Sequence, residues 1–258
     1  MDNHLLVPKI TLGSTELTIS RLGLGTVKLG RTQGVKYPQA FTLPNDTEAT
    51  ELLVTAHELG INLIDTAPAY GESETRLGQL IYGVASRPHW VLMSKVGEEF
   101  DNGESRFDFS PSHIKFSIER SLSRLKTDYL DIVLVHSDGR DQALIEEEGV
   151  FDTLNRLKEQ GYFRYFGMST KTVSGGLLTV QQADVVMVTH HLEYQEEKTV
   201  IEAALAHHKG VFIKKALGSG HLPDPKAALR FALAEPGVSS VIVGTRNPAH
   251  LKENAQLD

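Results

Sequence analysis

The stretch "INLIDTAPAYG", residues 61–71, begins as a buried strand and ends on a charge. Its opening residues are apolar around Asn62, which is typical of a strand that is covered on both faces. Asp65 follows at once, and Tyr70 comes five residues later. An aspartate can cap the next turn and a tyrosine can fill a loop. These two residues alone therefore do not distinguish a structural role from a functional one, and other parts of the sequence are needed.

The composition indicates an ordinary globular protein. Of 258 residues, 40% are hydrophobic and 23% are charged, and the formal net charge is −7. The negative charge disfavours nucleic acid as a partner, and no apolar run approaches the roughly 18 to 20 residues of a membrane span. The absence of cysteine excludes disulfides and thiolate metal sites, and "MDNHLLVPKI" does not resemble a secretory signal. We therefore predict a cytoplasmic protein with one domain over residues 1–258, no metal and no membrane partner.

Eight β-rich runs recur along the chain, with amphipathic helical patterns between them. The runs are Leu22 to Thr26, Ile61 to Asp65, Trp90 to Lys95, Leu130 to His136, Phe163 to Gly167, Val185 to Thr189, Val211 to Lys214 and Ser240 to Gly244. Strands that alternate with helices indicate parallel pairing. Eight such units in about 250 residues match an α/β fold of the closed (β/α)8 TIM barrel type. A doubly wound open sheet is the alternative, although its G-x-G-x-x-G turn is missing.

Capping residues mark the ends of several of these helices. "SPSHIKFSIERSLSRLK" has Ser110 as an N-cap before a proline, and "VFDTLNRLKEQG" stops at Gly161, a C′ residue. "KTVIEAALAHHKG" predicts the same role for Gly210. Ahead of the first strand, "KITLGSTELTI" reads as two short strands around Gly13 and Ser14. We expect this N-terminal β-hairpin to close the bottom of the barrel.

Polar residues end three neighbouring strands of the predicted barrel. Asp65 ends the second strand and carries Tyr70 in its loop, Lys95 ends the third and His136 ends the fourth. Because chemistry in a (β/α)8 barrel sits at the C-terminal ends of the strands, we expect the four side chains to meet. A buried lysine is costly unless it is paired, and Asp65 is the available partner.

The segment "GINLIDTAPAYGESETRLGQLI" resembles the signature of the aldo-keto reductase family. Further pieces resemble the family in the same order: "GSTELTISRLGLGT", "SIERSLSRLKTDYLDIVLVH", "FDTLNRLKEQGYFRYFGMST" and "VIVGTRNPAHLKEN". The resemblance runs from about residue 11 to 255. It implies a nicotinamide-dependent carbonyl reductase whose catalytic residues are Asp65, Tyr70, Lys95 and His136.

The implied chemistry is consistent with the properties of these side chains. Hydride reduction of a carbonyl leaves an oxyanion that needs a proton, and Tyr70 is the expected general acid. A phenol with a pKa of about 10 is a poor donor at neutral pH, but a neighbouring ammonium favours the phenolate. We therefore expect Lys95 to lower the pKa of Tyr70, with Asp65 keeping Lys95 charged. A neutral His136 is expected to direct the substrate oxygen toward Tyr70.

The resemblance also implies which residues bind the cofactor. They are Gly25, Thr26, Asp65, Ser169, Thr170, Met187, Lys214, Ala216, Leu217, Gly218, Gly244, Thr245, Arg246, His250, Glu253 and Asn254. Backbone N–H groups at the start of the last helix, near Pro248, form an anion site together with Arg246. A guanidinium suits a phosphate, so NADPH is favoured. NADH is an alternative because the family often has a basic residue where His250 stands.

Three positions depart from the family at the nicotinamide end. The usual Ser-Asn of the fifth strand is Ser169-Thr170 here. The sixth-strand glutamine corresponds to Met187, or to His191 in another register. Lys214 replaces the aromatic residue that stacks on the ring, so we expect either a weaker cofactor contact or a lysine that reaches the phosphates.

The sequence therefore predicts an NAD(P)H-dependent reductase of aldehydes and ketones, with a small carbonyl or alcohol molecule as its partner. Two alternatives are an NAD-dependent sugar dehydrogenase that works oxidatively and a nucleotide-sensing subunit with little turnover. The long first loop, residues 27–46, is a candidate wall of the site, with Tyr37 and Phe41 as contacts and Val27 and Lys28 as residues that cover the cofactor. Because the family's C-terminal covering loop is missing after Asp258, we expect an open site, a truncated chain or a partner subunit that completes the site.

Overall fold

The computed structural model describes residues 6–256 and contains a closed barrel of eight parallel strands. Neighbouring strands follow the order β10-β11-β12-β3-β4-β5-β8-β9. Their bounds are β3 (Leu22–Gly25), β4 (Leu63–Asp65), β5 (Val91–Val96), β8 (Leu130–His136), β9 (Phe163–Ser169), β10 (Val185–Thr189), β11 (Gly210–Lys214) and β12 (Ser240–Gly244). The closed ring confirms the predicted (β/α)8 barrel, and the open-sheet alternative is wrong.

Residues 1–5, on which the secretory-signal expectation partly rests, and residues 257–258 lie outside the described part. The assignment of one domain to the whole chain stays a prediction. In the described range, none of the helices combines the length and the apolar character that a membrane crossing requires.

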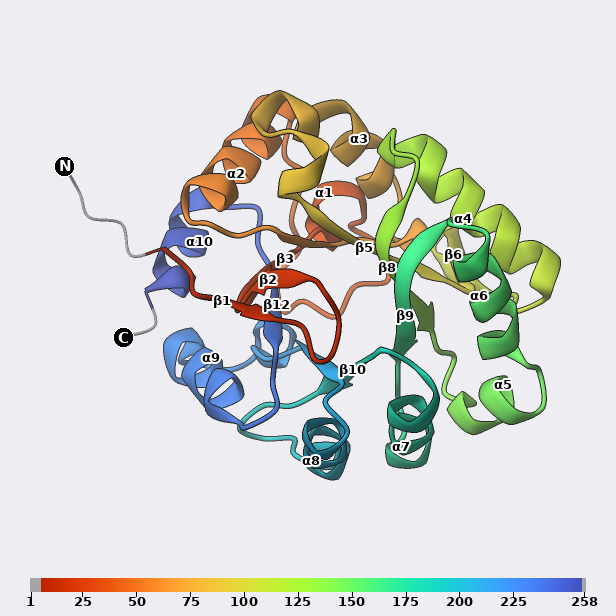
Figure 1. Ribbon diagram of the computed structural model, residues 1–258. Coiled ribbons are helices and arrows are strands. Elements are labelled where there is room, and N and C mark those ends of the chain that lie inside the picture. The colour runs from red at the N-terminus through yellow and green to blue at the C-terminus, as the bar shows by residue number, and fades with distance from the viewer. Residues whose placement is uncertain (1–5, 257–258) are drawn as a thin grey trace.

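Helices surround the barrel (Figure 1). The longer ones are α2 (Asp46–Glu58), α3 (Ser73–Val84), α4 (Pro111–Leu125), α6 (Val150–Glu159), α7 (Val173–Gln182), α8 (Lys198–Ala206), α9 (Pro225–Ala234) and α10 (Pro248–Ala255). The short ones are α1 (Val27–Gly30), α5 (Asp141–Glu146) and the 3-10 turns η1 (Pro68–Tyr70), η2 (Arg87–His89) and η3 (Gly218–Gly220). Two hairpins complete the fold: β1 (Lys9–Thr11) with β2 (Thr18–Ser20), and β6 (Glu98–Asp101) with β7 (Glu104–Phe107).

The first hairpin closes one end of the barrel, as expected from the sequence. In Figure 1, β1 and β2 cross the centre of the ring in front of the strands. Leu12, Leu17 and Ile19 of the hairpin region pack with barrel residues such as Leu63 and Phe212 in one buried cluster. The hairpin therefore fills the N-terminal end, and the opposite end is left for the site.

The cap predictions are confirmed at two helices and wrong at a third. Ser110 Oγ accepts a hydrogen bond from the N–H of His113 at 3.3 Å, and Gly161 after α6 has a φ of +85°. After α8 the left-handed position belongs to His208, with a φ of +53°, whereas Gly210 begins β11. The glycine is needed there for another reason, since a Cβ atom on it would lie 2.4 Å from Leu12 Cδ1 of the hairpin region.

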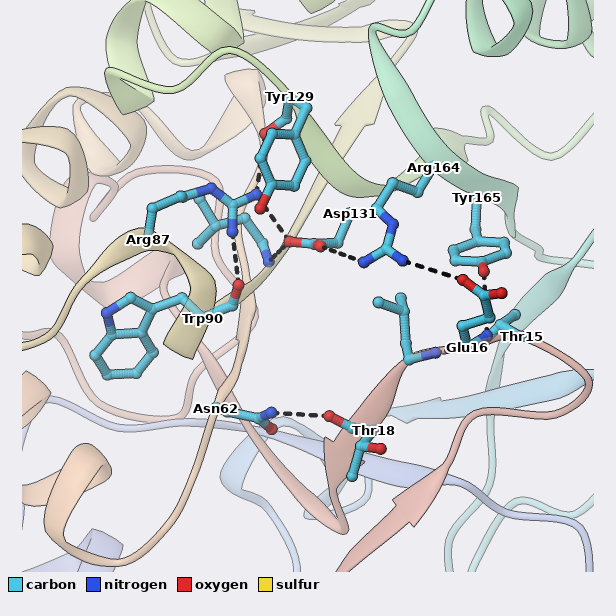
Figure 2. A network of polar contacts seen from close by, with 12 residues as sticks. Thr15, Glu16, Thr18, Asn62, Arg87, Trp90, Tyr129, Asp131, Arg164 and Tyr165 are labelled. Atoms are coloured by element: carbon cyan, nitrogen blue, oxygen red, sulfur yellow. Dashed lines mark hydrogen bonds and ion pairs between the residues drawn. The ribbon is translucent and has the colours of Figure 1, made fainter.

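A polar network joins the strand starts to the hairpin at this closed end (Figure 2). Asp131 Oδ2 accepts hydrogen bonds from Arg87 Nη2 at 2.8 Å and from the N–H of Leu92 at 2.9 Å. Its other oxygen lies 3.7 Å from Arg164, which in turn lies 3.7 Å from Glu16 Oε2. The ion pairs at this end serve stability rather than chemistry, because the active ends of the strands lie opposite.

Asp131→Asn should therefore destabilise the protein without changing its catalytic activity. Asparagine can still accept from Leu92, but Arg87 loses its counter-charge, and breaking a buried ion pair costs roughly 3 kcal/mol. Chemical denaturation measures the free energy of unfolding. Asp128→Asn, at an exposed aspartate nearby, is the matched control and should change it by less than about 0.5 kcal/mol. Equal stability of the two variants would contradict the assignment.

Candidate active site

The four polar residues predicted to meet do line one cavity, at the C-terminal ends of the strands. The cavity has a volume of about 670 Å³ and is lined by Asp65, Tyr70, Lys95 and His136 among other residues. Asp65 and His136 are the last residues of β4 and β8, and Lys95 is the penultimate residue of β5. Their convergence follows from the parallel register of the barrel, which brings these ends together.

Local interactions fix the loop that carries Tyr70. Thr26 Oγ1 donates to the carbonyl oxygen of Asp65 at 2.9 Å, so α1 and the end of β4 are tied together. The 3-10 turn η1 has Pro68 in its first turn and ends at Tyr70. Gly71 follows with a φ of +61°, and a Cβ atom there would lie 2.2 Å from the carbonyl oxygen of Gly30. Only glycine permits this close approach, which sets the direction of the tyrosine.

Lys95 is buried between a carboxylate and the tyrosine ring. Its Nζ contacts Asp65 Oδ1 and donates to the carbonyl oxygen of Thr66 at 2.9 Å. The same Nζ lies 4.7 Å from the centre of the Tyr70 ring. Asp65 and Lys95 are 4% and 2% exposed, so the pair is shielded from water and its charges act strongly on neighbours.

The expected lowering of the pKa of Tyr70 is wrong. Burial raises the pKa of Tyr70 well above its ordinary value, and the negative charges of Asp65 and Glu98 raise it further. Arg31 acts in the opposite direction. Lys95 is paired with Asp65 and does not reverse this direction. Tyr70 therefore keeps its proton at neutral pH.

His136 has a carboxylate neighbour that the sequence did not reveal. Its Nδ1 lies 2.8 Å from Glu98 Oε2, and its ring centre is 6.2 Å from that of Tyr70. Burial lowers the pKa of His136, Lys95 and Lys214 lower it further, and Glu98 opposes them. This direction agrees with the neutral imidazole expected at pH 7.

Glu98 begins the short hairpin β6–β7. One signal was available: Asn102 and Gly103 form the turn between two short segments, and an Asn-Gly pair is typical of hairpins. Both residues have positive φ, at +50° and +86°. Apart from Phe100 and Phe107 the segment is polar, so it lacks the apolar alternation that identifies strands.

Most of the predicted cofactor residues also line the cavity. They are Gly25, Thr26, Asp65, Ser169, Met187, Lys214, Ala216, Leu217, Gly244, Thr245, His250, Glu253 and Asn254. Three others lie outside the lining. The Thr170 hydroxyl donates to Glu197 at 3.0 Å, Gly218 turns toward Leu222, and Arg246 lies at the exposed rim.

The sixth-strand alternatives are decided by strand pairing. Met187 pairs with Ser169 of β9 and Phe212 of β11, and its side chain lines the cavity. His191 forms a bridge with Tyr194 beyond the strand and does not line the cavity. Met187 rather than His191 therefore lines the cavity, and its correspondence to the family's glutamine stays a prediction.

Lys214 points across the barrel toward the end of β9. Its Nζ donates to Ser169 Oγ at 2.8 Å and to the carbonyl oxygen of Thr170 at 2.5 Å. Burial lowers the pKa of Lys214 to about 7, although Glu197 opposes this effect. The expectation that this lysine reaches the cofactor phosphates stays a prediction.

Further lysines on the cavity wall had no place in the sequence prediction. Lys171, Lys215 and Lys226 line the cavity, as does Lys28, which was expected there. Lys28 Nζ lies 4.1 Å from the centre of the Tyr37 ring. Lys171 and Lys215 directly follow Thr170 and Lys214 at strand ends, and this position in the sequence indicates that they face the cavity.

The lining fits a dinucleotide in size, charge and backbone access. Five lysines outside the catalytic group line the cavity and give it the positive charge that phosphates require. A Cβ atom on Gly244 would lie 3.2 Å from Tyr37 Oη, so glycine allows the first loop to close over the end of β12. His250, Glu253 and Asn254 of α10 form the far wall. These residues could hold the nucleotide end of a cofactor.

Comparison with known proteins identifies similar chains. The sequence model of the aldo/keto reductase family matches residues 21–227. The Pseudomonas aeruginosa protein PA4992, whose crystal structure is assigned to the aldo-keto reductases, is 50% identical, with a TM-score of 0.90 over 99% of this chain and 96% of that one. The uncharacterized oxidoreductase YqkF of Bacillus subtilis is 28% identical, covering 96% of this chain and 90% of its own. An NADH-specific methylglyoxal reductase of Escherichia coli is 33% identical over 62% of this chain and 51% of its own.

Proposed function

Because the chain belongs to the aldo/keto reductase family, we propose that it reduces aldehydes and ketones to alcohols with a nicotinamide cofactor. The observation that carries this proposal is the meeting of Asp65, Tyr70, Lys95 and His136 in one cavity. The cofactor, when bound, supplies the hydride. The chain supplies the rest of the chemistry, which is orientation of the carbonyl and delivery of a proton.

Tyr70 is the proton donor in this proposal. Its raised pKa keeps it protonated at neutral pH, which a donor requires before the oxyanion develops. Lys95, held by Asp65, lies close enough to the ring to stabilise negative charge as it forms on the phenol. His136, whose ring centre lies 6.2 Å from that of Tyr70, orients the substrate oxygen.

We further propose NADPH as the preferred cofactor. Arg246 Nη1 donates to the carbonyl oxygen of Thr42 at 3.2 Å, which holds the guanidinium at the rim. Burial lowers the pKa of Lys28, and the nearby charge of Arg246 lowers it further. A phosphate bound between Lys28 and Arg246 would reduce the repulsion between their positive charges. NADH stays an alternative, as the NADH-specific Escherichia coli relative illustrates.

A spectrophotometric panel tests the proposal. Methylglyoxal, 4-nitrobenzaldehyde and glyceraldehyde are each mixed with the protein and NADPH or NADH, and the loss of absorbance at about 340 nm is followed. We expect turnover with at least one aldehyde and faster turnover with NADPH. Tight cofactor binding without turnover, in this direction and with aldoses in the reverse direction, would contradict the proposal and favour the nucleotide-sensing alternative.

Arg246→Ala tests the cofactor preference. Hydrogen bonds to a charged group contribute roughly 1.5 to 3 kcal/mol, so the Kd for NADPH should rise about 10- to 100-fold while that for NADH changes little. Isothermal titration calorimetry measures both. Arg230→Ala, at an exposed arginine of α9 away from the cavity, is the control and should leave both constants unchanged. If the substitution weakened the binding of NADPH and of NADH equally, Arg246 would not be the residue that binds the phosphate.

A further inference from the structure

One carboxylate beside the candidate catalytic group has no role in the proposed reaction. Glu98 lies on β6, and its Oε2 is 2.8 Å from His136 Nδ1. Its Oε1 accepts a hydrogen bond from Ser105 Oγ at 2.6 Å and lies 3.7 Å from Arg31 Nη1. The side chain is 12% exposed, so its contacts with these groups take the place of most of its contacts with water.

The contacts keep Glu98 ionised. Burial alone would raise the pKa of Glu98, but His136, Ser105 and Arg31 outweigh it and lower the pKa to about 2. An ionised carboxylate has only acceptor oxygens. The ring nitrogen that faces Glu98, 2.8 Å from Oε2, is Nδ1, although the contact does not have the geometry of a formed hydrogen bond in this structure. The carboxylate therefore favours a hydrogen on Nδ1 of a neutral His136.

The hairpin that carries Glu98 is anchored to the catalytic loop. Arg31 Nη1 donates to the carbonyl oxygen of Ala69 at 3.0 Å, one residue before Tyr70. The guanidinium also lies 3.4 Å from the centre of the Phe100 ring on β6. One arginine thus links the turn of the tyrosine to the strand of the glutamate, so the two are held in a fixed relation.

We infer that Glu98 is a positioning residue that fixes the proton of His136 on Nδ1 and leaves Nε2 to act on the substrate oxygen. Nδ1 is inaccessible to solvent, while the imidazole lines the cavity. With the proton on Nδ1, a neutral Nε2 accepts a hydrogen bond from an alcohol. A second proton, which Glu98 stabilises, converts Nε2 into a donor toward a carbonyl oxygen. The same arrangement, in which a carboxylate orients a histidine, is used in serine proteases.

The charged groups around His136 set the direction of its pH response. Glu98 favours the imidazolium, whereas Lys95 of β5 and Lys214 of β11 oppose it, and Tyr70 of η1 faces the ring without a charge. Removing the negative charge of Glu98 should therefore lower the pKa of His136. A neutral Nε2 without a hydrogen cannot donate to a carbonyl oxygen, so reduction uses the imidazolium form of His136, which is the minor form at pH 7. The reduction rate should therefore fall with rising pH, and the fall should begin at a lower pH in Glu98→Gln.

The first test measures the proton directly and needs no turnover. Long-range ¹H–¹⁵N correlation spectra of the whole protein report the tautomer of each histidine, and His136→Asn identifies the resonance by its loss. We expect a neutral His136 with its hydrogen on Nδ1. A hydrogen on Nε2 would overturn the inference, whatever the activity of the protein.

The second test uses kinetics and rests on the proposed function. With 4-nitrobenzaldehyde, kcat/KM for Glu98→Gln should fall roughly 10- to 100-fold at neutral pH, as for other residues that orient a reacting histidine or ligand. The KM for the cofactor should be unchanged, and Glu98→Asp should recover part of the loss. Glu99→Gln is the control, because the Glu99 side chain contacts Arg120 and His113 of α4 instead.

The outcomes separate the two proposals. If Glu98→Gln has the pH profile of Glu99→Gln, the positioning role is refuted while the reductase function stands. If no variant and no wild-type protein turns over, the proposed function fails, and the tautomer of His136 still decides the role of Glu98. Ser105→Ala, which removes only the 2.6 Å hydrogen bond to Glu98, should give a smaller shift in the same direction and serves if Glu98→Gln does not fold.

Discussion

Tyr70→Phe should reduce kcat/KM for aldehyde reduction by roughly 100- to 10,000-fold, the usual contribution of a positioned general acid. Phenylalanine keeps the ring beside Lys95, at 4.7 Å in the native structure, and beside His136, so only the hydroxyl is lost. Cofactor affinity should be nearly unchanged, because the substitution removes an interaction made with the reacting oxygen. Absorbance at about 340 nm gives the rate, and calorimetry gives the affinity.

The control for this substitution is Tyr82→Phe. The Tyr82 hydroxyl donates to the carbonyl oxygen of Leu125 at 2.9 Å, between α3 and α4. Its loss should cost about 1 kcal/mol of stability and leave kcat/KM within twofold. If Tyr70→Phe stayed within threefold of the wild type, the acid assignment would be wrong.

Asp65→Asn should reduce both stability and activity. Lys95 is buried, and Asp65 is the carboxylate it contacts; without that charge an uncompensated ammonium is left inside the barrel. Removing one partner of a buried ion pair costs roughly 3 to 5 kcal/mol, which corresponds to a fall in Tm of at least about 6 °C for a domain of this size. Thermal and chemical denaturation measure the loss.

The double variant Asp65→Asn with Lys95→Met separates charge from packing. Methionine fills the space of the lysine stem without a charge, so the stability lost in the single variant should largely return. The activity should not return, because no cation remains beside Tyr70. A single variant as stable as the wild type would show that Asp65 does not balance Lys95.

The barrel was predictable from the sequence because its signals are local and repeated. Apolar runs of four to seven residues such as "LDIVLVH" show strands covered on both faces, and Asp65, Lys95 and His136 mark the ends at which a barrel collects its chemistry. Gly13 lies in a turn, as predicted from the sequence. Gly210 misled, because a glycine after a helix indicates a cap, whereas here it allows Leu12 to approach β11.

The finer features of the site depended on distances between segments far apart in the sequence. The choice between Met187 and His191 required the strand register, and the direction of Lys214 required the position of Ser169. The pKa of Tyr70 depends on which charged side chains lie near its ring in the folded chain. A strand-end pattern shows that Lys95 is near, but it does not show that Asp65 compensates its charge or that Glu98 is close.

The transfer of deuterium from the cofactor to the substrate tests the central claim most directly. The protein is incubated with 4-nitrobenzaldehyde and NADPH that carries deuterium at both positions of C4 of the nicotinamide, and the product alcohol is analysed by mass spectrometry. We predict one deuterium on the carbinol carbon of the product with the wild type, and none above background with Tyr70→Phe in the same time. An alcohol without deuterium, or unchanged aldehyde despite bound cofactor, would contradict the account.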